Sequence, residues 1–350
     1  MAYTTIDNPE LYFQCKLYTG NATARSITLD GSEDMQPDFV WIKRRNSSRN
    51  HALLDSVRGG TKQLVSNLTN DEGTDTGLIT SFDSNGFSIG TSNDCNSSSD
   101  TYVAWCWKAG GSASSNSNGT ISSSVSANTT AGFSILTYTG TGSAATIGHG
   151  LGAKPKTIWL KERNGSGTQA WSVFHEDIDL NKRMILNSTE AEYDDNPTPD
   201  WNETDPTTSV FSVGATSYRT NINSANFVAY CFTDIKGYSK FGSYVANGNS
   251  DNVFVYTGFR PSFLMTKLSS HEGGGWEIVD NKRDGYNGEN NRLYPNDNAA
   301  EGTGNDYDLL SNGFKVRQSG GNQQSGRTNI YAAFAESPFV NSNGVPTNAR

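Results

Sequence analysis

The 350-residue chain repeats one plan three times, and this repetition constrains its fold more than any other feature. Each copy has a proline that leads an apolar stretch, with a lysine six residues further on. These pairs are Pro37/Lys43, Pro155/Lys161 and Pro261/Lys267. A tyrosine precedes the proline by 19, 17 and 17 residues in the three copies, at Tyr18, Tyr138 and Tyr244. Because a repeat with near-constant spacing marks one structural unit used several times, the copies predict the same set of elements.

Each copy also ends on a strongly apolar segment, at 102–107, 227–232 and 331–335. A continuous apolar run of this length predicts a central strand that is covered on both faces. Cys106 and Cys231 take the same place in the first two segments, and we expect Ala335 to take it in the third. A small buried residue explains all three, so the cysteines are predicted to be free thiols.

Strand and turn signals dominate the rest of each copy. Asn-Gly turns, which supply the positive φ of tight connections, precede alternating segments at 86–89 and 313–316. Five or six short strands in about 100 residues predict an antiparallel sandwich. We therefore expect an all-β protein with three serial antiparallel β-sandwich repeats of jelly-roll-like type. The expected repeats and tail are 1–110, 132–236, 237–340 and the polar 341–350.

The segment 111–131 is rich in Gly, Ser, Asn and Thr, and its composition predicts a flexible linker. Repeats two and three are joined almost directly and are expected to pack rigidly. A flexible linker favours an independent first repeat. The alternative is one fused body, in which the three copies share a core around a pseudo-axis.

Composition limits the classes of partner. The chain has 27 basic and 36 acidic residues, a net charge of −9, which disfavours nucleic acid because phosphate binding depends on an excess of Lys and Arg. No run of about 18 apolar residues is present, so we expect no membrane insertion. The first ten residues lack the basic and apolar regions of a signal peptide, which indicates synthesis without export.

The search for catalytic patterns predicts a protein that is not an enzyme and has no cofactor or metal site. The four histidines are not accompanied by a nucleophile elbow, a P-loop or a zinc-protease motif. His51 stands where the other copies have Trp171 and Trp276, so a packing role is expected for it. His149 lies between two glycines and is predicted to be an exposed turn residue. Paired carboxylates such as Asp177 and Asp179 leave glycosidase or calcium chemistry as weaker alternatives.

The one region that interrupts the repeat, between residues 187 and 210, is the best candidate for recognition. It brings Tyr193, Asp194, Asp195 and Trp201 into one loop. Loops with aromatic residues on a β scaffold often bind ligands, and a sugar ring can stack on an aromatic while carboxylates hold its hydroxyls. The alternative is that Trp201 covers an edge of its own sandwich.

Beyond these patterns, several segments carry a family resemblance: 18–21, 37–43, 51–59, 102–111, 227–232, 237–244, 256–261 and 334–339. Through them the chain resembles a domain of unknown function that is common in marine bacteriophage structural proteins. The resemblance covers nearly the whole chain. It implies a virion surface protein of tail-fibre or capsid-decoration type, made in the host cytoplasm, with other virion proteins as partners. The family has no established active site, so no catalytic residue is carried over.

The resemblance also bears on assembly. The chain begins directly at the repeat and has no heptad shaft, which favours a capsid decoration or a fibre tip over a complete fibre. Fibres and decorations sit at symmetry axes, so the resemblance implies a homo-trimer, with a monomer as the alternative. The competing function is a lectin-like or polysaccharide-degrading module whose partner is a host surface glycan.

Overall fold

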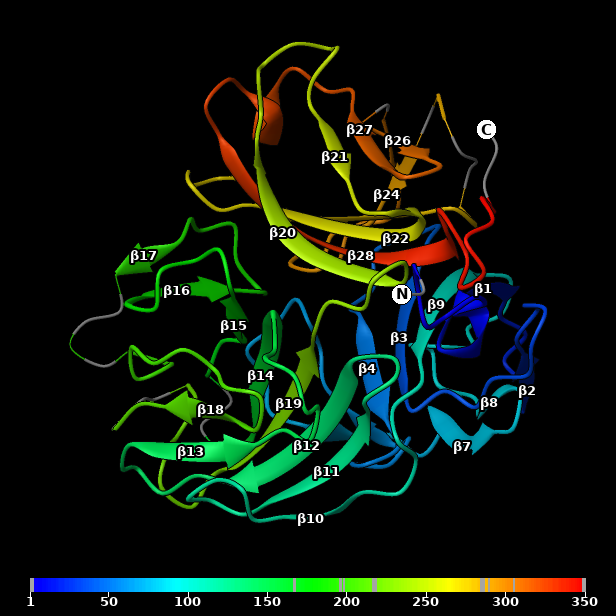
Figure 1. Ribbon diagram of the computed structural model, residues 1–350. Coiled ribbons are helices and arrows are strands. Elements are labelled where there is room, and N and C mark those ends of the chain that lie inside the picture. The colour runs from blue at the N-terminus through cyan, green and yellow to red at the C-terminus, as the bar shows by residue number, and fades with distance from the viewer. Residues whose placement is uncertain are drawn as a thin grey trace.

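The computed structural model describes residues 3–165, 168–194, 197, 199–215, 219–283, 287–288, 290–304 and 306–347. The described residues form antiparallel β-sheets and two short 3-10 helices, η1 (Pro9–Leu11) and η2 (Gly321–Gln323), without an α-helix. The all-β class predicted from the sequence is therefore confirmed. Figure 1 shows three lobes around a common centre, one for each copy of the repeat.

Each copy contributes one inner sheet with the same strand order. The inner sheet of copy one is β1 (Phe13–Thr19), β9 (Thr101–Trp107), β3 (Phe39–Arg44) and β4 (Ala52–Asp55). That of copy two is β12 (Phe133–Thr139), β19 (Asn226–Phe232), β14 (Thr157–Asn164) and β15 (Ser172–His175), continued by β16 (Lys182–Ile185) and β17 (Tyr193–Asp194). That of copy three is β20 (Ser239–Val245), β28 (Thr328–Pro338), β22 (Phe259–Leu268) and β23 (Trp276–Asp280). The apolar closing segment of each copy is thus a central strand, as predicted.

A smaller outer sheet lies on each inner sheet. The outer sheets are β2 (Arg25–Thr28), β8 (Gly86–Ile89) and β7 (Ile79–Asp83); β13 (Ala145–Gly148) and β18 (Val210–Val213); and β21 (Phe254–Tyr256), β27 (Gly313–Val316) and β26 (Tyr307–Leu310). Two hairpins complete the lobes, β5 (Lys62–Gln63) with β6 (Gly73–Thr74) and β24 (Asn290–Arg292) with β25 (Gly302–Gly304). Between outer and inner sheet, each copy has its own apolar core.

The opposite faces of the three inner sheets meet in one central aromatic core. Its ring contacts cross from copy to copy: Phe39 stacks on Tyr230 at 4.4 Å, and Trp107 lies 5.4 Å from Phe263. The third boundary is closed by Phe232, whose ring centroid is 5.7 Å from that of Phe334. The three copies therefore form one body with a shared core, and the expectation of separately packed units in series is corrected.

The segment 111–131 is also not a flexible linker. It contains β10 (Ser114–Asn116) and β11 (Ser123–Asn128), and β11 pairs antiparallel with β12. Ile121 and Val125 are buried in the core of copy two. Composition misleads here because strand pairing uses backbone groups, so two apolar anchors are enough to fix a polar segment on a sheet edge.

The expected equivalence of Ala335 with the two cysteines is two residues out. Cys106 lies opposite Val40 and Cys231 opposite Ile158, whereas Ala333 lies opposite the corresponding Leu264. The register of β22 and β28 shifts around Pro261, and the sequence does not reveal this irregularity. The four cysteines are buried free thiols, as predicted.

We predict that a fragment of residues 1–110 will not fold alone. It would expose Phe13, Phe39, Trp41, Trp105 and Trp107, which the other copies cover. Five such rings represent up to about 20 kcal/mol of burial, which is more than the roughly 5–15 kcal/mol net stability of a domain. Near-UV circular dichroism should show no fixed tertiary structure, in contrast to the full chain. A cooperative thermal transition of the fragment would contradict the shared-core interpretation.

Candidate functional site

The repeated lysines join the copies into a closed ring. Each lysine Nζ donates a hydrogen bond to a backbone carbonyl of the preceding copy, and copy one reaches back to copy three. The bonds are Lys161 to Thr69 at 3.1 Å, Lys267 to Glu190 at 2.7 Å and Lys43 to Asn298 at 3.2 Å. Burial lowers the pKa to about 8 for Lys43 and Lys161 and to about 7 for Lys267. These lysines donate hydrogen bonds that join neighbouring copies, which explains why each copy has a lysine at this position.

A second ring of hydrogen bonds runs in the same direction. Trp171 Nε1 donates to the Val65 carbonyl and Trp276 Nε1 to the Ile185 carbonyl, both at 2.9 Å. In copy one His51 replaces the tryptophan. Its Nδ1 accepts from Trp41 Nε1 at 2.8 Å, so Nε2 carries the proton and donates to the Tyr294 carbonyl at 2.9 Å. Burial lowers the pKa of His51 to about 3, which fits the packing role predicted for it.

Two buried arginines occupy boundaries between copies. Arg58 pairs with Asp55 at 2.5 Å, and Tyr230 of copy two donates its hydroxyl to the same carboxylate at 2.7 Å. In copy three Arg283 pairs with Asp280 at 2.6 Å. There Trp105 of copy one donates to Asp280 at 2.9 Å. All three nitrogens of each guanidinium donate to a carboxylate or a carbonyl, so these groups fix the boundaries and do not form anion sites.

The other buried histidines, His149 and His175, offer little for acid–base catalysis. His149 is buried and its Nδ1 accepts from the Leu151 amide at 3.2 Å, so the predicted exposed position is wrong: the glycine-flanked turn folds inward. Burial lowers the pKa of both His149 and His175 to about 4. Burial also raises the pKa of the cysteine thiols. No group of three metal-binding side chains occurs in the part of the chain that the structure describes.

The structure separates the residues of the predicted recognition loop. Trp201 is 2% exposed and packs on Phe174 and Phe211, at 5.7 and 6.2 Å between ring centroids. It therefore covers its own sandwich, which was the alternative, and offers no ring to a ligand. Tyr193 in β17 is half-buried, with the Arg183 guanidinium 3.8 Å from its ring centroid. Asp194 is exposed beside it, and Asp195 lies outside the described residues.

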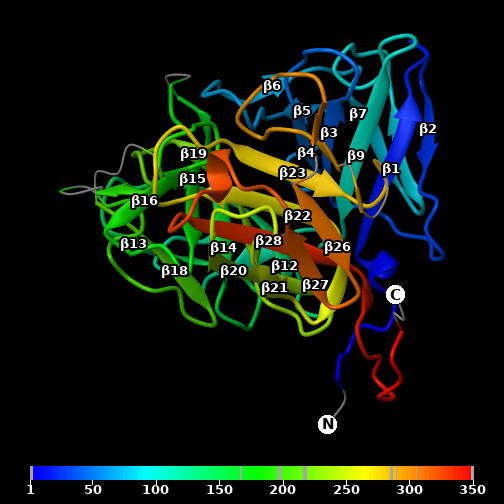
Figure 2. The ribbon, with the colours of Figure 1, turned by 90° about the horizontal axis from the view of Figure 1, so that it is seen from above.

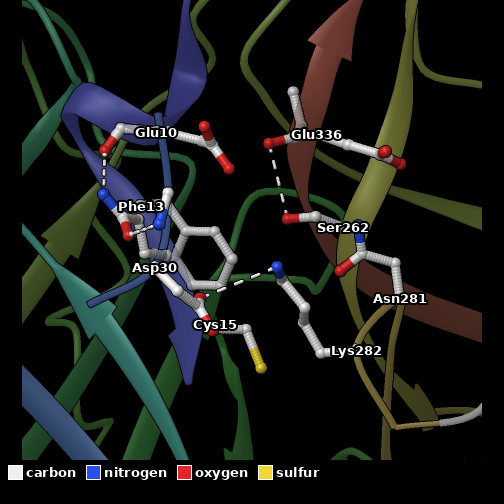
Figure 3. A pocket seen from close by; sticks show the side chains of 11 residues that line it. Glu10, Phe13, Cys15, Asp30, Ser262, Asn281, Lys282 and Glu336 are labelled. Carbon is white, nitrogen blue, oxygen red and sulfur yellow. Dashed lines mark hydrogen bonds and ion pairs between the residues drawn. The ribbon is translucent and has the colours of Figure 1, made fainter. Parts of the chain in front are cut away.

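A small cavity lies where copies one and three meet, lined by Glu10, Asp30, Ser262, Asn281 and Lys282 (Figure 3). Lys282 and Asp30 form an ion pair across it at 3.7 Å. The free volume is about 20 Å³, which is room for one water molecule. The cavity is therefore part of the boundary between copies and cannot hold a substrate.

A larger groove of about 380 Å³ opens on copy three. The hydroxyls of Tyr3 and Tyr256 are 2.7 Å apart in it, and Lys236 Nζ lies 4.4 Å from the Tyr3 ring centroid. Lys240 pairs with Asp234 at 3.5 Å on the same wall. Tyr256 is exposed and Tyr3 half-buried, and tyrosines at the surface beside charged groups contact sugars and peptides well, so this groove is the better candidate site. Sequence reasoning missed it because Tyr3 and Tyr256 are 253 residues apart.

Fold and surface together define an all-β repeat protein that is closed on itself by a shared core. Residues 8–338 match the model of a domain of unknown function, DUF7483, and the chain belongs to this family. No curated protein and no solved structure matches the chain. Within the described residues, no helix is long and apolar enough to span a bilayer.

Replacing Asp55 by Ala should destabilise the protein by about 3–5 kcal/mol, because Arg58 would remain buried without its carboxylate partner. Urea unfolding measures the loss. Asp179→Ala is the matched control, since that side chain is 76% exposed and its removal should change stability by less than about 0.5 kcal/mol. Equal effects of the two substitutions would show that the buried pair does not hold the boundary.

The stability of the chain should fall on acidification between pH 6.5 and 4, and His51 should contribute. In this range the unfolded chain protonates at residue 51, whereas the folded chain does so only near its pKa of about 3. At pH 5 the contribution is on the order of 2 kcal/mol. His51→Gln should flatten the dependence of unfolding free energy on pH by about one proton, whereas His271→Gln at an exposed site should not. An unchanged slope in His51→Gln would refute the assignment.

Proposed function

We propose that the protein is a non-enzymatic structural component of the bacteriophage particle surface, of tail-fibre or capsid-decoration type. The phage context comes from the resemblance of the repeated motifs. The observation that supports the non-enzymatic class is the use made of the reactive side chains. The buried lysines and His51 hydrogen-bond to groups of another copy, and the carboxylates that pair with the two buried arginines accept hydrogen bonds from Tyr230 and Trp105 of another copy, so these groups serve the boundaries of the fold.

This use of side chains suits a surface component. A core to which all three copies contribute ties them together by packing, and such packing raises the cost of local unfolding, which suits a component exposed to binding forces. Four buried free thiols fit synthesis in the reducing host cytoplasm, where disulfides do not form. On this proposal the partners are other virion proteins, and a homo-trimer is one arrangement in which copies of the chain would sit at a symmetry axis.

The groove of copy three favours a second candidate, a lectin-like contact with a host surface glycan. Tyr3 and Tyr256 offer ring faces, and Lys236, Lys240 and Asp234 offer hydrogen-bonding groups. No pair of exposed catalytic carboxylates lines this groove among the described residues, so binding is favoured over polysaccharide degradation.

Immunogold labelling of intact particles with antibodies against the purified chain tests the proposal. We expect gold at one site of the particle, with pre-immune serum as the control, and the chain in the mass spectrum of purified virions. Absence of the chain from purified particles would refute the structural role.

A glycan array tests the second candidate separately. Binding that is lost in Tyr256→Ala and kept in Tyr193→Ala would favour the lectin-like function. Release of oligosaccharides from host polysaccharide would instead indicate an enzyme and would overturn the non-enzymatic class.

A further inference from the structure

Copy three differs from the other copies at three outward-facing positions. The strand registers, anchored on Phe87, Phe211 and Phe314, give the equivalent residues. Copy one has Thr19, Ser26 and Thr28; copy two has Thr139, Thr146 and Gly148; and copy three has Val245, Phe254 and Tyr256. The side chains of copy three are 56%, 44% and 51% exposed. A small or hydroxyl residue is thus replaced by a large apolar or aromatic one at each of the three places.

The fold itself does not need these three side chains. Part of the Phe254 ring lies on Gly313, and Tyr256 bonds to Tyr3, yet about half of each ring remains in water. Copies one and two build the same strands with serine, threonine or glycine at these positions. Phe254 and Tyr256 flank the buried Val255 and so share the outer face of β21, where exposed aromatic side chains indicate a contact surface.

Copy two shows what covers the equivalent side. There a strap, residues 119–128, runs from the outer sheet to the inner sheet. The Ile121 amide donates to the Thr146 carbonyl at 3.1 Å and the Ser123 hydroxyl to the Gly148 carbonyl at 2.7 Å, along the edge of β13. The strap then continues as β11, which pairs with β12. Ile121 and Val125 fill the space between the two sheets.

Copy one closes the same side with side chains. Gln14 of β1 donates to the Glu33 carbonyl and accepts from the Gly31 amide, both at 2.9 Å, in the loop that follows β2. Lys16 adds an ion pair with Asp30 at 3.1 Å. Because copy three has Lys240 and Gly242 at the positions of Gln14 and Lys16, it lacks the side chains that make these contacts.

The same side of copy three is therefore open. Strands β20 and β21 lie side by side at the surface (Figures 1 and 2), and each is an edge of its sheet in the described chain. Asp234 accepts from the outward amide of Phe241 at 2.9 Å. By the alternation of an antiparallel strand, the backbone groups of Ser243 and Val245 face the same way, and no described strand pairs with them.

We propose that this open side of copy three, formed by β20 and β21, binds an extended segment of a partner protein. The segment would add antiparallel to β20 at the free backbone groups of Ser243 and Val245, next to the part of the edge that Asp234 already occupies, and set apolar side chains against Phe254 and Tyr256 of β21. Strand addition at a free edge takes affinity from backbone hydrogen bonds and specificity from alternate side chains. This inference extends the proposed function. It rests on that proposal only in taking the partner to be a virion protein.

A synthetic peptide of residues 119–128, the strap of copy two, serves as the probe. We expect fluorescence anisotropy to show saturable binding to the full-length chain. Hydrogen exchange should show new protection at Ser243, Val245 and 254–256. The variant Phe254→Ser with Tyr256→Thr carries the residues of copy one, so it should unfold within a few degrees of the parent. It should bind the peptide at least tenfold more weakly. The matched control, Ser26→Ala with Thr28→Ser, should leave binding unchanged.

Several outcomes would overturn the inference. The strand-addition site would be refuted if 1 mM peptide gave no protection of β20, or if the Phe254→Ser, Tyr256→Thr variant bound the peptide as tightly as the parent. Protection of β20 that grows with protein concentration and without peptide would make the occupant a second copy of this chain. A glycan that protects only the groove around Tyr3 would favour the lectin-like contact instead. Peptide binding is independent of particle labelling, so a failure of the site and a failure of the virion role give different results.

Discussion

The aromatic core that the three inner sheets share is the contact on which the rest of the structure depends. Because it covers their inner faces and the outer sheets lie on the opposite faces, the centres of these sheets are shielded from solvent, and polar groups there must find partners across a boundary. The lysine ring, the Trp/His ring and the two buried Arg–Asp pairs supply those partners. The lysine and Trp/His bonds, and the Tyr230 and Trp105 bonds to the paired aspartates, each run from one copy to the preceding one, so one rule of packing explains most of the repeated polar residues.

The same rule explains where the copies are free to differ. At the boundary between copies two and three, His175 and Ile178 replace the Asp–Arg pair, and His175 lies 3.4 Å from the Tyr331 carbonyl. A neutral imidazole, held so by burial, needs no counter-ion there. Toward solvent the constraint disappears, and the copies diverge most: a strap in copy two, side-chain bridges in copy one and an open side in copy three.

Spacing in the sequence was enough to predict the all-β class and the central position of the closing strands, because repeated motifs and apolar runs report local pairing and burial. It could not predict the strap, since Ser and Thr suit an edge strand and a linker equally. The burial of Trp201 and His149 depends on which surface a loop folds against. The groove of Tyr3 and Tyr256 depends on the path of the N-terminal segment past copy three, and no local pattern encodes that path.

Fusion of three copies into one chain releases their outer surfaces from the requirement to be identical. A trimer of single repeats would close the same core but would present three identical outer sides, and association would cost translational and rotational entropy. In one chain the neighbours are held at high effective concentration, and each outer side can evolve separately. Since the chain closes its own ring, its inner faces are already covered. Any higher assembly must therefore use outer surfaces, among which copy three offers the free strand edges and the exposed apolar side chains.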